Sequence, residues 1–136
     1  MTITVEWESQ EKRYLIANYY SGWSLSDFKI LKQETDKRLV SVDYLVDALV
    51  IFHNHSKTTK EHLPPSAASI NIASAFDTAP DNLNHIYIIN AGVLMKIIIN
   101  TAQRLAPNSP AQNMHFIETL EEALEIIDNR SRSQRK

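Results

Sequence analysis

Hydrophobic and polar positions along the chain switch repeatedly between a two-residue spacing and a helical spacing. Residues 3–7 alternate in the manner of a half-buried strand, and the apolar-rich segment 13–20 predicts a second, antiparallel strand after a polar connection. Thr119 followed by Glu122 matches a capping box and predicts the start of the last helix. Between these, the spacing predicts a helix at 25–39, a strand at 42–52, a small-residue helix at 66–77, a strand at 85–90, a helix at 92–106 and a strand at 114–117.

The order of these elements, ββαβαβαβα, is typical of an α/β fold. Strands that alternate with helices are joined by right-handed crossovers and pair in parallel, while the opening hairpin adds an antiparallel edge. We therefore expect a mixed, mostly parallel sheet of about five strands with four helices mainly on one face. A length of 136 residues leaves room for one domain, which we assign to residues 1–129, followed by a basic disordered tail at 130–136.

Composition and charge exclude several classes of protein and site. The chain has no cysteine, which excludes a disulfide framework and a thiolate metal site. The net charge is −2, and because the tail 130–136 carries four basic groups and no acid, the rest of the chain has a net charge of −6. Charge of this sign does not favour nucleic acid as a partner. We find no secretory signal and no apolar run near the ~20 residues of a membrane span, so we expect a cytoplasmic protein.

The predicted helix at 92–106 is unusually apolar. At about 100° per residue its hydrophobic side chains cover an arc of roughly 240°, whereas a helix on one face of a sheet needs little more than about 100°. The excess surface can pack against a neighbouring helix, against a second copy of the chain in a homodimer, or around a small apolar ligand. Gly92, Met95, Ile98 and Ile99 are therefore candidates for a ligand or partner surface.

Asp47 and the histidines that follow it have the clearest potential for chemistry. Asp47 lies in the apolar run 42–52, where it either accepts backbone N–H groups at the carboxyl end of the strand or binds a ligand at that edge of the sheet. His53, His55 and His62 have a spacing that could hold a metal, but too few other ligands lie nearby. We therefore predict an ordinary polar loop and no metal.

The sequence has no catalytic signature. It contains neither a G-x-S-x-G nucleophile elbow nor a glycine-rich phosphate loop, since Gly22 and Gly92 stand alone. Asp43 and Asp47 would lie roughly 13 Å apart along a strand, too far to share a proton. We expect no enzymatic activity, no catalytic residue and no cofactor.

Four stretches of the chain resemble a known family. They are the hairpin leading into residues 20–24 (YSGWS), the strand at 42–47 (VDYLVD), the strand at 85–90 and the segment 115–124 (HFIETLEEAL). With the element order, they resemble STAS-like domains, the sulfate-transporter and anti-sigma-factor-antagonist group. The most similar branch is the small, stand-alone bacterial one described as sporulation-antagonist-like (SpoIIAA-like). The resemblance implies a STAS fold, a regulatory function and a protein partner.

The regulatory switch of that family is a serine phosphorylated within an Asp-Ser-Ser-Gly motif. If Asp47 matches the acid of the motif, then Ala48, Leu49 and Val50 follow it, so this chain has neither the hydroxyl nor the glycine. The resemblance also implies a second role, the binding of small apolar or lipid-like ligands, which needs only a cavity.

These observations predict a non-catalytic regulatory or protein-interaction module that self-associates. The alternative is a binder of a small apolar or lipid-like ligand in a cavity beside the 92–106 helix. The predicted ligand or partner surface comprises Asp47, Val50, His53, His55, Ser56, Gly92, Met95, Ile98 and Ile99.

Overall fold

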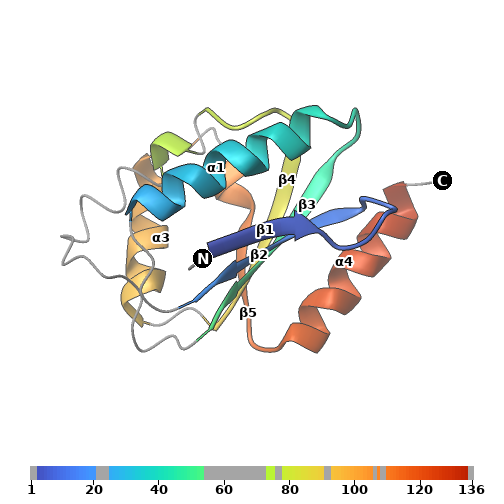
Figure 1. The fold of residues 1–136 in the computed structure, drawn as a ribbon. Coiled ribbons are helices and arrows are strands. Elements are labelled where there is room, and N and C mark those ends of the chain that lie inside the picture. The colour runs from blue at the N-terminus through green and yellow to red at the C-terminus, as the bar shows by residue number, and fades with distance from the viewer. Residues whose placement is uncertain are drawn as a thin grey trace.

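A five-stranded sheet forms the centre of the computed structural model (Figure 1). Its strands are β1 (Ile3–Trp7), β2 (Tyr14–Tyr19), β3 (Val46–Phe52), β4 (Leu83–Ile89) and β5 (Met114–Ile117). The strands lie in chain order, β1 pairs antiparallel with β2, and the other pairs are parallel. The residues described are 3–20, 25–53, 73–75, 78–90, 93–105, 107 and 110–134.

Helices cover both faces of this sheet. One face carries α1 (Leu25–Val40) and α3 (Val93–Leu105), and the opposite face carries α4 (Leu120–Gln134) (Figure 1). Each parallel strand lies beside the strand that precedes it in the chain, so crossovers of one hand bring their helices to the same face. The helix α4 follows the last strand and is free of that constraint. A helical turn at 73–75 and a 3₁₀ helix (Pro110–Asn113) complete the described helical residues.

The two faces of the sheet have separate hydrophobic cores, which is why the central strand is apolar except for Asp47. On β3, Ala48 and Phe52 belong to the cluster beneath α1 and α3, whereas Leu49 belongs to the cluster beneath α4. A strand covered on both faces loses the alternation of a half-exposed strand. The largest fully buried side chains come from both cores: Leu15, Leu39, Val46, Leu49, Ile88 and Ile127.

The structure confirms the predicted fold class, a mixed and mostly parallel α/β sheet with helices, and it differs most from the prediction at two boundaries. The strand predicted at 42–52 begins only at Val46, because residues 41–44 form the turn that follows α1. The predicted tail at 130–136 is helical as far as Gln134, where α4 ends. Thr119 caps this helix as expected, since its Oγ1 accepts the Glu122 backbone N–H at 3.2 Å.

Candidate functional site: an apolar cavity beneath α1

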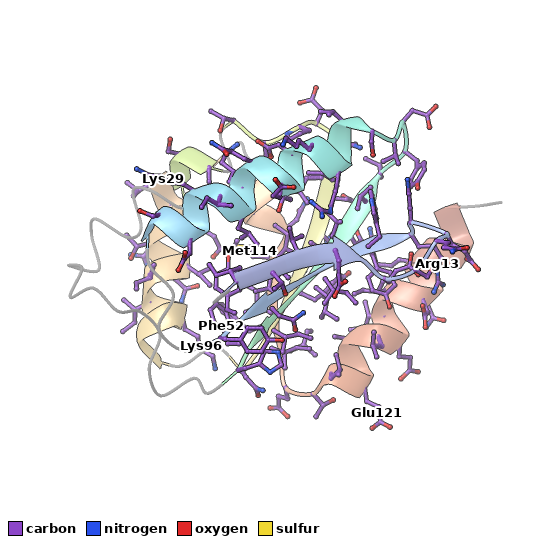
Figure 2. The ribbon with its side chains drawn as sticks, in the orientation of Figure 1. Arg13, Lys29, Phe52, Lys96, Met114 and Glu121 are labelled. Carbon is purple, nitrogen blue, oxygen red and sulfur yellow. The ribbon has the colours of Figure 1, made fainter. Side chains whose placement is uncertain are left out.

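A cavity of about 120 Å³ lies between α1 and the sheet face that α1 covers. Strands β1 to β5, helix α3, Ala75 and Ala79 all contribute to its wall. Two of the lining side chains, Phe52 and Met114, are labelled in Figure 2. Hydrophobic side chains form nearly all of the described lining: Val5, Leu15, Ala17, Tyr19, Phe28, Leu31, Ala48, Val50, Phe52, Ala75, Ala79, Leu83, Ile86, Ile88, Ile99 and Met114.

The remaining described lining residues come from a single turn of α1. They are Lys32, Thr35 and Asp36. Lys32 Nζ forms an ion pair with Asp36 Oδ2, and the two side chains are 25% and 30% exposed. Thr35 Oγ1 donates a hydrogen bond to the Leu31 carbonyl at 2.8 Å. The cavity therefore has one polar, partly exposed edge on α1 and an apolar floor on the sheet.

Tyr19 is a lining residue with an uncharged phenol side chain. Its side chain is buried and packs at a tilt against Phe52, with 4.8 Å between the ring centroids. Burial raises the pKa of the Tyr19 hydroxyl well above its usual value, because the phenolate would lose its hydration. Tyr19 is therefore neutral at physiological pH.

Two of the predicted site residues line this cavity. They are Val50 on β3 and Ile99 on α3. Ile98 lies in the same hydrophobic core but does not line the cavity. The alternative prediction of a cavity beside the 92–106 helix thus has a counterpart in the structure, although among the described side chains α1 contributes more of the wall than α3 does.

Only some of the hydrophobic side chains of the predicted 92–106 helix are buried in the core. Ile98, Ile99 and Ala102 are buried, whereas Ile97 and Leu105 are 52% and 50% exposed. A charged residue substituted for Ile98 would therefore lie in the protein core and destabilise the folded chain, so such a variant would not test a homodimer contact by itself. The homodimer stays a prediction.

Asp47 lies on the opposite face of the sheet from the cavity. It is the second residue of β3, at the amino end and not at the carboxyl end as the sequence suggested. Only 6% of it is exposed, Oδ1 accepts the His85 backbone N–H at 3.0 Å, and Oδ2 pairs with Arg130 Nε at 3.1 Å. The structure therefore places Asp47 in a bridge between β3, β4 and α4, apart from Val50 and Ile99.

The predicted polar loop is described only at its first residue. His53 Nε2 forms a hydrogen bond with Asn18 Oδ1 at 2.8 Å, and the imidazole stacks on Tyr20 with 4.6 Å between centroids. The structure describes neither His55, Ser56 and Gly92 nor the side chain of Met95. Within the residues that the structure does describe, no three metal-binding side chains come together.

A second cluster of titratable groups lies beside Asp47. His85 Nδ1 and His115 Nε2 are 2.9 Å apart, and Tyr87 stacks on His115 with 5.4 Å between centroids. Burial and the positive charge of Arg130 lower the pKa of His85. Burial, aided by Asp47, raises the pKa of Tyr87. These side chains lie on the sheet face that α4 covers, where Tyr87 is buried and His115 is exposed, and they do not line the cavity.

The cavity residues of α1 were missed because their polar members were expected on the solvent face. In the sequence, Phe28 and Leu31 fall on one hydrophobic stripe of the helix predicted at 25–39, and Lys32 and Asp36 fall largely on its other side. Phe28 and Leu31 do lie on the inner side. Lys32 and Asp36 lie at the border of that stripe. Their spacing of four residues was the one available signal that they act as a pair.

Comparison with known proteins identifies a family for most of the chain. Residues 26–135 match the model of the divergent CRAL/TRIO domain. No curated protein and no solved structure matches the chain. None of the described helices is long and apolar enough to cross a membrane.

The family match corrects the function predicted from the sequence. The matching model is not that of a STAS domain, so the STAS and SpoIIAA-like assignment is not supported, and the regulatory, protein-interaction function that it implied was wrong. The matched range covers α1, the parallel strands β3 to β5, α3 and α4, which together hold most of the cavity wall. The chain belongs to the divergent CRAL/TRIO domain family.

Proposed function

We propose that this protein binds a small apolar molecule, or the apolar end of a lipid-like molecule, in the cavity beneath α1, and that it does so without catalysing a reaction. The observation that carries the proposal is an internal space whose described lining is hydrophobic except for one helical turn. Cavities of this kind do not hold water well, because water needs several polar partners. The family agrees with this function, since the CRAL/TRIO domain is a lipid-binding fold.

The size of the cavity defines what fits in this conformation. An apolar cavity of about 150 Å³ in another protein binds benzene, and the space here is about 120 Å³. It therefore suits a single ring or a short stretch of alkyl chain. Each buried methylene contributes about 0.8 kcal/mol, so a segment of about four methylenes gains roughly 3 kcal/mol.

Benzene is a suitable probe, because it tests the cavity without engaging any polar group. We expect benzene to shift the amide NMR signals of residues around Val50 and Ile99. Benzene should also raise the melting temperature, because a ligand that binds only the folded protein increases its free energy of unfolding. At a hundredfold excess of benzene over its Kd this increase is about 2.7 kcal/mol.

A matched pair of variants locates the binding. Val50 and Ile51 are neighbours on β3, both are half-buried, and they point to opposite faces of the sheet. Val50→Phe should fill the cavity and abolish the benzene response, while Ile51→Phe should retain it. Loss of the response in both variants, or in neither, would contradict the proposed site.

A further inference from the structure

The polar residues of α1 lie at one edge of the cavity, so the cavity has a polar side and an apolar side. Lys32, Thr35 and Asp36 lie on one turn of this helix, and the floor opposite them is made of strand residues such as Leu15, Val50 and others of the same apolar kind. An amphiphilic ligand that keeps both of its ends satisfied must place its polar end at this turn. Its apolar end then points toward the sheet.

The charge of the turn is already balanced before a ligand arrives. Lys32 and Asp36 form an ion pair, and both side chains are largely shielded from solvent. A carboxylate at this position would face the Asp36 carboxylate and compete with it for Lys32. An ammonium group would face Lys32 and compete with it for Asp36. Either ligand would leave one charge without a partner in a partly buried place.

A hydroxyl matches the donors and acceptors that the turn presents. Its oxygen can accept a hydrogen bond from the Lys32 ammonium, which has three N–H donors. Its O–H can donate to Asp36 or to Thr35, whose own proton is directed to the Leu31 carbonyl. One uncharged group therefore satisfies both kinds of partner and leaves the ion pair intact.

We infer that the cavity selects amphiphiles with an uncharged hydroxyl head, such as alcohols with an apolar tail, over carboxylates and amines with the same tail. Lys32 and Asp36 determine this specificity together. The inference rests on the proposed function, because it concerns the polar end of the ligand that the cavity would hold.

Three probes with the same six-carbon chain test the inference: 1-hexanol, hexanoate and hexylammonium. Their Kd values are measured by amide NMR titration at neutral pH. We expect 1-hexanol to bind at least about tenfold more tightly than either charged probe, which corresponds to about 1.4 kcal/mol. A charged probe that binds as tightly as 1-hexanol would overturn the inference.

Two substitutions separate selection by this turn from the general cost of removing a charge from water. Asp36→Asn leaves Lys32 unpaired, so the affinity for hexanoate relative to 1-hexanol should rise about tenfold. Lys32→Gln leaves Asp36 unpaired and should raise the relative affinity for hexylammonium in the same way. Glu34→Gln is the matched control, since Glu34 lies on the same helix, pairs with Lys37 and does not line the cavity.

The outcomes distinguish this inference from the function on which it rests. If the two variants change the ratios no more than Glu34→Gln does, the turn does not contact the head group and the inference fails while the proposed function stands. If neither benzene nor any six-carbon probe binds, the proposed function itself fails. A melting temperature for each variant shows that it is folded when its Kd is measured.

Discussion

The bridge between Asp47 and Arg130 shows how unevenly two partners of one ion pair are buried. Asp47 is 6% exposed, whereas the Arg130 side chain is 32% exposed and can turn toward water. Asp47 also accepts the His85 backbone N–H, which an asparagine at the same position could still bind through its carbonyl oxygen. Removing either partner therefore has a different consequence.

Arg130→Met should destabilise the protein more than Asp47→Asn does. The first substitution leaves a buried carboxylate without its counter-charge and should lower the free energy of unfolding by about 3 kcal/mol, and the second by about 1 kcal/mol. Urea unfolding measures both. Lys37→Met provides the control, since the exposed Lys37–Glu34 pair should contribute less than about 1 kcal/mol. Equal losses for the two bridge variants would show that Asp47 is not effectively buried.

The connection from α1 to β3 depends on one side chain from a distant segment. Asn82 Nδ2 donates to the carbonyls of Leu39 at 2.8 Å, Tyr44 at 3.1 Å and Val42 at 3.4 Å. The backbone carbonyl of Asn82 accepts the Val46 N–H at 2.8 Å. The side-chain amide thus pairs the Leu39 carbonyl, which the last turn of α1 leaves without an intrahelical partner, and two carbonyls of the connection that follows. The bond from the Val46 N–H to the Asn82 backbone carbonyl lies where β3 begins.

Asn82→Asp should destabilise the protein more than Asn82→Ala. Alanine removes the donor and should cost about 1–3 kcal/mol, whereas aspartate keeps the shape but directs carboxylate oxygens at carbonyl oxygens. Thermal and urea unfolding test this order. Asn100→Ala, on an exposed position of α3, should change stability by less than about 0.5 kcal/mol. Retention of full stability in both Asn82 variants would mean that the turn forms without this amide.

At the scale of the whole molecule, the sheet separates two different environments. The face beneath α1 and α3 holds the apolar cavity, and the face beneath α4 holds the histidine pair beside the Asp47–Arg130 bridge. The pair His85–His115 can share a hydrogen bond only while at least one of the facing nitrogens is unprotonated. Protonation of His85 also adds a positive charge near Arg130, which the carboxylate of Asp47 offsets only in part.

Stability should therefore fall as the pH is lowered through the histidine range. Because the pKa of His85 in the folded protein is below its ordinary value of 6.5, the unfolded chain binds this proton first. The free energy of unfolding is thus highest above pH 6.5 and decreases as the pH falls below it toward the folded pKa. Melting temperatures across this range test the sign, and His85→Gln should flatten the dependence. A melting temperature that rises on mild acidification would contradict the assignment.

Local patterns in the chain were sufficient for the order and type of the elements. The alternation at 3–7, the apolar run that ends in Phe52, the stripe of α1 and the cap at Thr119 each depend on residues close together in sequence, and each has its counterpart in the structure. Once strands alternate with helices, the handedness of the crossovers leaves few arrangements other than a mostly parallel sheet. The fold class therefore followed from the sequence.

Only the tertiary structure decided which residues meet. Arg130 and Asp47 are 83 positions apart, and no periodicity relates them. The cavity is a gap that remains when side chains from five strands and two helices meet those of Ala75 and Ala79. It therefore depends on how the volumes of these side chains add up and not on any local pattern. Lys32 and Asp36 have the four-residue spacing of an ordinary ion pair on a helix surface. They are candidates for ligand recognition because the fold places them at the edge of the cavity.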